Sequence, residues 1–267
     1  MAQRISIDKV TDPRADDFRD LSTADRRPDR PGGRGLVIAE GTVVVRRLLA
    51  SDYPVRAVLG VPRRIDELAG ELAGVDVPAY DTSAEVMAEI VGFHLNRGVL
   101  AVADRAPRPR AADVVARSRV VAVLEGVGDH ENLGALFRNA AALGVGGVLL
   151  GPGCSDPLYR RSVRVSMGNV LRVPFAPLEP WPDGLTWLRE NGFRVAALTP
   201  RADSVSLREL AADGGKVALL LGSEGPGLTA EALAAADVAV RIPMSEGVDS
   251  LNVATAAAVA FYELSGR

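Results

Sequence analysis

The stretch LEGVGDHENLGALFRNAAALG, residues 124–144, combines the end of an apolar strand, a glycine-containing turn and an amphipathic helix. Dinucleotide-binding folds place their phosphate loop at such a turn. The spacing does not fit that class, because Glu131 replaces the third glycine of a G-x-G-x-x-G pattern starting at Gly126. Carboxylates at this turn would also repel a pyrophosphate, and no Gly-Lys-Ser/Thr sequence follows it. The stretch therefore predicts a strand–turn–helix unit built for another ligand.

The helix of this unit has one apolar and one polar face. Helical spacing predicts a buried face made of Leu133, Leu136, Phe137, Ala140 and Leu143. Arg138 lies roughly opposite that face and should point to solvent, a ligand or a partner subunit. Asn132 occupies the position expected for the helix N-cap, and Gly134 allows another backbone to come close. Taken singly, capping explains Asn132 and surface exposure explains Arg138.

Composition excludes several classes of protein. The chain has 267 residues, of which 48% are hydrophobic, enough for one large domain or two smaller ones. No apolar run reaches the roughly eighteen residues of a membrane helix, and the amino-terminal stretch lacks a hydrophobic leader, so we expect a soluble cytoplasmic protein without membrane association. One cysteine and two histidines leave little material for a metal site, so we expect none. The net charge of −3 does not by itself indicate nucleic-acid binding.

Changes in amino-acid composition and in the hydrophobic pattern divide the chain into four segments. Residues 1–34 are crowded with charge, proline and glycine and predict an extended arm with one short helix. Residues 35–105 alternate apolar strands with helices and predict a compact α/β module. The proline-containing residues 106–118 predict a linker. Residues 119–267 form a second α/β series, whose uniformly apolar strands predict a parallel sheet covered on both faces.

Two later stretches strengthen the functional interpretation. LLLGSEGPGLT, residues 219–229, ends a buried strand in a loop with three glycines and one acid, Glu224. Such a loop exposes backbone groups at the carboxyl end of a parallel strand, where α/β folds bind ligands. RIPMSEGVDSLNVATAAAVAFYEL, residues 241–264, predicts a strand, a loop and an alanine-rich helix that opens at Ser250 and Asn252. Capping of this helix is the simplest explanation for both polar residues.

In this order, the three stretches resemble the SpoU (TrmH-like) family of RNA ribose 2′-O-methyltransferases, within the SPOUT superfamily. The motif N-x-G-x-x-x-R-x-A matches Asn132, Gly134, Arg138 and Ala140. The G-x-E-G-x-G-like loop matches Gly222, Glu224, Gly225 and Gly227. The strand ending I-P-M and the following S-L-N-x-A match Ile242, Pro243, Met244, Ser250, Leu251, Asn252 and Ala254. GLVIAEGTVVVRRLL and GFHLNRGVLAVADR resemble the family's amino-terminal substrate-binding domain.

The resemblance implies a fold and partners. It implies that residues 119–267 form a parallel-sheet domain with a deep carboxy-terminal trefoil knot that binds S-adenosylmethionine (S-adenosyl-L-methionine). It implies that residues 35–105 form a small α/β/α domain that binds RNA, and that the protein is a homodimer. The absence of extra basic terminal helices favours ribosomal RNA, most of all 23S rRNA, over tRNA as the structured RNA substrate. A tRNA ribose 2′-O-methyltransferase and a non-catalytic RNA-binding protein are the alternatives.

The resemblance also implies roles for individual residues. It places Arg138 at the reaction as a base or as an electrostatic stabiliser, with Asn132, Glu224, Ser250 and Asn252 positioning Arg138, the cofactor chain and the ribose. The cofactor's adenine and ribose would lie on Leu198, Thr199, Leu221, Gly222, Ser223, Gly225, Ile242, Pro243, Met244, Ser250 and Leu251.

Overall fold

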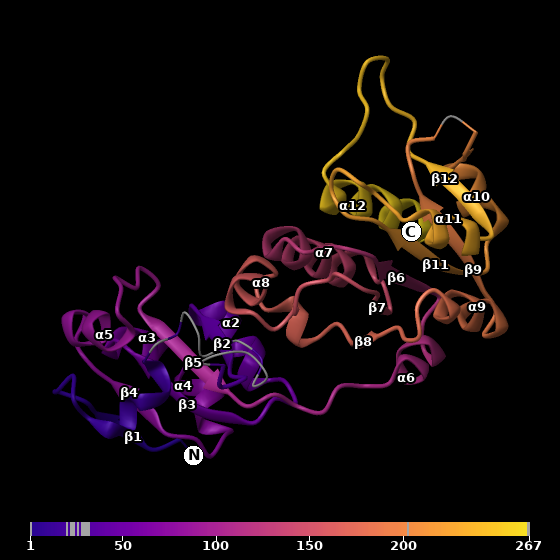
Figure 1. Ribbon diagram of the computed structural model, residues 1–267. Helices are drawn as coiled ribbons and strands as arrows, with labels where there is room; N and C mark the ends of the chain where they lie inside the picture. The colour runs from indigo at the N-terminus through magenta and orange to yellow at the C-terminus, as the bar shows by residue number, and fades with distance from the viewer. Residues whose placement is uncertain are drawn as a thin grey trace. The chain divides into compact units, whose positions relative to one another are not determined.

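The computed structural model describes residues 2–19, 21, 25, 27, 33–201 and 203–265, and it divides into two compact units (Figure 1). Unit 1 consists of Met1–Pro107 and Pro157–Arg172. Unit 2 consists of Arg108–Asp156 and Val173–Arg267. The first of the three passages of the chain between the units, after Pro107, lies inside the predicted linker of residues 106–118. In the described part of the chain, no helix is both long and apolar enough to cross a membrane.

Unit 1 is built on a five-stranded mixed sheet with the order β1-β4-β3-β5-β2. The strands are β1 (Arg4–Ser6), β2 (Val37–Glu40), β3 (Val55–Gly60), β4 (Ala79–Asp81) and β5 (Val99–Ala103). The helices of the unit are η1 (Pro13–Phe18), α2 (Thr42–Leu49), α3 (Pro62–Glu67), α4 (Ala69–Ala73), α5 (Ala84–Val91), α8 (Arg160–Val165) and η2 (Asn169–Leu171). β5 pairs antiparallel with β2 and β3, whereas β4 pairs parallel with β1 and β3.

Part of the predicted amino-terminal arm is folded into unit 1. β1 extends the sheet by pairing with β4, and Phe18 at the end of η1 is fully buried with its ring edge against Tyr80. The predicted short helix is present as η1, whereas the prediction of an extended arm was wrong for β1. Two isoleucines and one phenylalanine among many charges anchor these residues to unit 1. Residues 20, 22–24, 26 and 28–32 of the predicted arm lie outside the described residues.

The segment Pro157–Arg172 belongs to unit 1, although the sequence placed it in the carboxy-terminal domain. The backbone N–H of Arg160 donates to Asp25 Oδ2 at 2.6 Å, and the guanidinium of Arg47 donates to the carbonyl of Met167. Met167 and Gly168 both have positive φ, which lets the chain turn sharply after α8 and brings Gly168 against α2. Contacts made by a turn of this kind have no periodicity that a sequence pattern could reveal.

Unit 2 contains a seven-stranded sheet with the order β10-β12-β9-β11-β6-β7-β8, in which every pairing is parallel. The strands are β6 (Val120–Leu124), β7 (Gly147–Leu150), β8 (Phe175–Pro177), β9 (Phe193–Leu198), β10 (Val205–Ser206), β11 (Lys216–Leu221) and β12 (Val238–Arg241). The α/β fold with a parallel sheet is thus confirmed. The trefoil knot stays a prediction of the resemblance.

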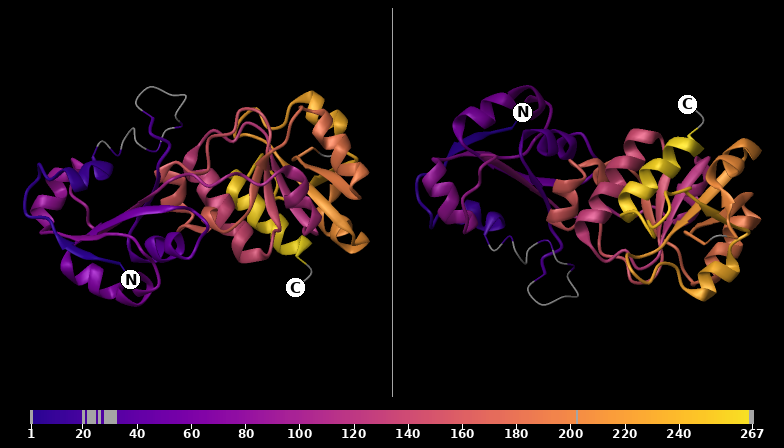
Figure 2. Two further views of the ribbon diagram at one scale, coloured as in Figure 1. Left: turned by 90° about the horizontal axis from the view of Figure 1, so that it is seen from below. Right: turned by 90° about the horizontal axis from the view of Figure 1, so that it is seen from above.

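Helices flank both faces of this sheet (Figures 1 and 2). They are α6 (Ala111–Ala116), α7 (His130–Leu143), α9 (Asp183–Glu190), α10 (Leu207–Asp213), α11 (Ala230–Ala235) and α12 (Val253–Leu264). All five residues of β6 are buried, as a strand covered on both faces requires. α6 lies within the predicted linker, where the buried side chains of Val114 and Val115 attach it to the core. α7 packs against α12, which brings the first and last family-like motifs together.

Candidate functional site

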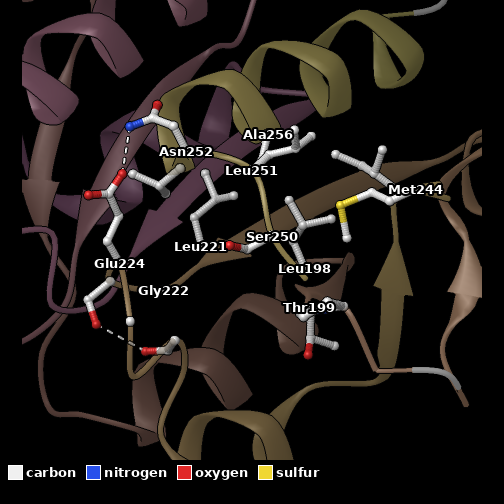
Figure 3. Close-up of a pocket in the computed structure, with 16 residues that line it drawn as sticks. Leu198, Thr199, Leu221, Gly222, Glu224, Met244, Ser250, Leu251, Asn252 and Ala256 are labelled. Carbon is white, nitrogen blue, oxygen red and sulfur yellow. Dashed lines mark hydrogen bonds between the residues drawn. The ribbon is translucent and has the colours of Figure 1, made fainter. Parts of the chain in front are cut away.

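A pocket of about 420 Å³ opens at the carboxyl ends of β9, β11 and β12 and at the start of α12 (Figure 3). Parallel sheets commonly bind ligands at this edge, because the loops that follow neighbouring strands converge there. All of the predicted cofactor-binding residues except Pro243 line the pocket: Leu198, Thr199, Leu221, Gly222, Ser223, Gly225, Ile242, Met244, Ser250 and Leu251. Among the described lining residues, Glu224 is the one with a charged side chain.

The loop after β11 folds back on itself so tightly that only glycine fits at Gly222. A Cβ atom at Gly222 would lie 2.4 Å from the carbonyl carbon of Gly227. Gly225 and Gly227 have φ angles of +85° and +72°, which other residues rarely adopt. The Gly227 N–H donates to the Ser223 carbonyl at 3.1 Å and closes the turn. The three glycines of the sequence motif therefore form a compact loop with its backbone facing the pocket.

Glu125, directly after β6, anchors the far end of the same loop. Its buried carboxylate accepts hydrogen bonds from the backbone N–H of Thr229 at 2.9 Å, from the Thr229 hydroxyl at 2.8 Å and from Trp181 Nε1 at 3.1 Å. Thr229 is also the N-cap of α11. Sequence reasoning missed this residue; the signal available was an acid immediately after a fully apolar strand.

Asn252 joins the three family-like motifs. Its Nδ2 donates to Asn132 Oδ1 at 2.7 Å and to Glu224 Oε1 at 2.6 Å, the latter drawn in Figure 3. Its Oδ1 accepts from the backbone N–H groups of Ala254 and Thr255, so Asn252 is also the N-cap of α12. Asn252 thus donates to the two site residues through Nδ2 and caps α12 through Oδ1.

Asn132 is not the N-cap of α7, contrary to the sequence prediction. Asp129 Oδ1 accepts from the N–H groups of Glu131 and Asn132 at 2.9 and 2.8 Å, and α7 begins at His130. Aspartate and asparagine cap helices about equally well, and the aspartate comes first along the chain. Because Asp129 supplies the cap, the side-chain oxygen of Asn132 is available to Asn252.

Arg138 lies apart from this cluster. It is exposed on α7, as predicted, and makes no hydrogen bond or ion pair with any residue that the structure describes; it does not line the pocket. The adjacent Asn139 donates from Nδ2 to the Ala254 carbonyl at 2.9 Å and fixes α7 to α12. The predicted buried face of α7 is confirmed for Leu133, Leu136, Phe137 and Ala140, with Leu143 half-buried.

The one cysteine does not offer a reactive nucleophile. Burial raises the pKa of the Cys154 thiol, which points to the Leu124 carbonyl at 3.4 Å. The thiol is therefore neutral at physiological pH. Among the described residues, no group of three or more histidine, cysteine, aspartate or glutamate side chains could hold a metal ion.

Comparison with known proteins connects this geometry to a family. A family model described as the SpoU rRNA Methylase family matches residues 119–262. A protein of Mycobacterium tuberculosis named as a tRNA/rRNA methyltransferase is 61% identical over 254 residues, which cover 94% of this chain and 88% of that protein. The 23S rRNA (adenosine(1067)-2'-O)-methyltransferase of Streptomyces azureus is 34% identical over 165 residues, 61% of each chain.

A solved structure resembles the whole chain. The crystal structure of an AdoMet-bound rRNA methyltransferase from Sinorhizobium meliloti superposes with a TM-score of 0.81 at 25% identity and covers 98% of both chains.

Proposed function

We propose, because this chain belongs to the SpoU rRNA methylase family, that it transfers a methyl group from S-adenosylmethionine to a ribose 2′-hydroxyl of structured RNA, with 23S ribosomal RNA as the favoured substrate. The observation that carries the proposal is the meeting of Asn132, Glu224 and Asn252 beside the pocket. There the side-chain amide of Asn252, from the third motif, donates to one residue of each of the other two motifs. The name of the Streptomyces azureus relative supports both the 2′-O position and the ribosomal substrate.

The lining of the pocket is complementary to S-adenosylmethionine in polarity and charge. Leu198, Leu221 and Leu251 offer apolar surface. The loop from Gly222 to Gly227 offers backbone donors and acceptors, with no Cβ atom at its three glycines. Glu224, the one charged side chain among the described lining residues, is complementary to a cationic ligand and would repel the phosphates of NAD or ATP. When bound, S-adenosylmethionine supplies a methyl group on a positively charged sulfur, which is an excellent leaving group.

The remaining work for the protein is to orient the ribose and to stabilise the charge that develops on its 2′-oxygen. We assign that stabilisation to Arg138, because its exposed guanidinium has no partner among the described residues. A guanidinium can donate hydrogen bonds to a phosphate and to an oxyanion at the same time. A guanidinium stays protonated in proteins and is therefore a poor base, so the hydroxyl proton passes to water as the C–O bond forms and the S–C bond of the cofactor breaks. Asn132, Glu224, Asn252 and Ser250 position the reacting groups.

We further propose that α12 pairs with a second copy of the chain. Val259 and Tyr262 are 38% and 62% exposed and, with the exposed Thr255, form a stripe along α12 at helical spacing. Exposed apolar stripes of this kind mark interaction surfaces. α7, which packs against α12, carries Arg138 as well, so a dimer through these helices would bring the arginine near the partner's surface.

Two measurements test the proposed function. Calorimetry should detect S-adenosylmethionine binding, and NAD binding instead would support an oxidoreductase. Methyl-labelled S-adenosylmethionine incubated with rRNA or tRNA should yield labelled 2′-O-methylnucleosides after nuclease digestion, chiefly from rRNA. Binding of RNA and cofactor without transfer would support the non-catalytic alternative.

The role of Arg138 is tested separately. Arg138→Ala should abolish transfer while S-adenosylmethionine affinity stays within about threefold, because the residue lies outside the pocket. Arg117→Ala, which removes another exposed arginine of unit 2, should leave transfer unchanged. Retained turnover in Arg138→Ala would remove the assignment.

A further inference from the structure

The loop between α5 and β5, residues 92–98, presents an aromatic ring on the surface of unit 1. Phe93 is 37% exposed. The guanidinium carbon of Arg160, at the start of α8, lies 4.7 Å from the centre of the Phe93 ring. This is the geometry of a cation–π contact, in which the ring face attracts the positive charge. Arg160 thus lies over one face of a ring that is itself partly exposed.

The arginine is held in place by its own backbone. The N–H of Arg160 donates to Asp25 Oδ2 at 2.6 Å, and the Nη1 atom of its guanidinium is buried without a hydrogen-bond acceptor among the described residues. This nitrogen is enclosed by the protein, so the guanidinium is held at the ring and does not extend freely into solvent. The contact between Arg160 and the Phe93 ring is therefore preformed.

The two segments that carry the pair are basic, while the Asp25 carboxylate lies at the backbone N–H of Arg160. Residues 92–98 and 159–168 contain no acidic residue, and their basic residues are His94, Arg97, Arg160, Arg161 and Arg164. Arg97 reaches toward β2, because a Cβ atom on Gly41 would lie 2.8 Å from its Cδ, and Arg164 lies 3.9 Å from the buried Glu40 on the same strand. Arg97 thus shares the loop of residues 92–98 with Phe93, and Arg161 and Arg164 share α8 with Arg160.

We propose that Phe93 and Arg160 form a platform that binds an unpaired base of the RNA substrate, with Arg97 and Arg161 contacting the neighbouring phosphates. The proposal rests on the proposed function, which supplies RNA as the partner. Aromatic and guanidinium planes stack on single-stranded bases, whose faces are free, whereas bases inside a duplex are covered by their neighbours. The platform therefore selects RNA with a loop or bulge over continuous double helix.

The test compares two RNA probes with the full-length protein. One is a hairpin with 2-aminopurine in its loop, and the other is a fully paired duplex of the same length. Phe93→Ala should weaken hairpin binding about tenfold and remove the stacking-dependent change in 2-aminopurine fluorescence. Duplex binding should change less than about twofold, since it depends on phosphate contacts. Phe93→Tyr, which keeps an aromatic ring, should retain both hairpin signals.

Matched variants separate stacking from charge. Arg161→Ala should weaken binding of both probes and lower the salt dependence, whereas Arg63→Ala, an exposed arginine on α3, should change neither. Equal hairpin affinity for Phe93→Ala and the wild type would overturn the platform. Wild-type protein that methylates no RNA would instead overturn the proposed function, so the two failures are distinguishable.

Discussion

The side-chain amide of Asn252 donates to Glu224 Oε1 at 2.6 Å, and this bond ties the start of α12 to the glycine loop after β11. The same nitrogen donates to Asn132, so the loop, α12 and α7 are held at one point. A neutral amide suits this position because both of its partners are acceptors, and one of them is a carboxylate. The bond makes the geometry of the pocket rim dependent on the chemical identity of residue 252.

Asn252→Asp should therefore disrupt the rim without removing the helix cap. The new carboxylate can still accept from the N–H groups of Ala254 and Thr255, but it cannot donate to Glu224 and repels it. We expect S-adenosylmethionine affinity at pH 8 to fall about tenfold or more, as measured by calorimetry.

The pH dependence of this variant identifies the cause. Two adjacent carboxylates raise the pKa of one of them, and as pH falls through that raised value a shared proton restores a donor. Affinity of Asn252→Asp relative to the wild type should thus recover as pH falls from 8 toward 5. A deficit that is equal at both pH values would argue against repulsion from Glu224.

Gly222→Ala should block formation of the glycine loop. Its Cβ atom would lie 2.4 Å from backbone atoms of Gly227, and backbone cannot move aside as a flexible side chain can. We expect cofactor binding to become undetectable by calorimetry while the circular dichroism of the folded protein is retained. Gly70→Ala is the matched control, because a Cβ atom in this helical position of α4 has no neighbour within 4 Å; it should be neutral or slightly stabilising. Full cofactor affinity in Gly222→Ala would show that the loop is not part of the binding surface.

Glu125→Gln should loosen the opposite end of the same loop. The buried carboxylate accepts from three donors, whereas a glutamine amide would place an N–H group against one of them. We expect a loss of about 1–3 kcal/mol in the free energy of unfolding, measured with urea, together with a raised KM for S-adenosylmethionine. Trp181→Phe removes a single donor and should cause the smaller change in both quantities. Equal effects of the two variants on the free energy of unfolding and on KM would contradict the proposal that the hydrogen bonds from Thr229 to Glu125 anchor the loop.

Much of the fold was predictable because the core elements have clear periodicity. The apolar strands β6, β9 and β11 and the stripe of α7 follow from residue patterns alone, and so does the position of the glycine loop. Other features depend on contacts between distant residues. Asp129 rather than Asn132 caps α7, and Glu125 finds its donors 56 and 104 residues away. Which of several chemically similar residues forms a given hydrogen bond depends on the packed structure, and it cannot be predicted from the local spacing of residues.

Tyr262→Glu should separate the proposed dimer. The tyrosine is 62% exposed on α12, so the substitution has little effect on the core of one chain. In a dimer with two-fold symmetry, however, each chain would bury one unpaired carboxylate in the interface. Analytical ultracentrifugation should show a dimer for the wild type and a monomer for the variant at micromolar concentration. Val43→Glu, which adds the same charge at an exposed apolar position of α2 in unit 1, should remain dimeric. If the dimer also delivers Arg138 to the RNA, the monomeric variant should bind S-adenosylmethionine yet lose transfer; an active monomer would place the complete reaction within one chain.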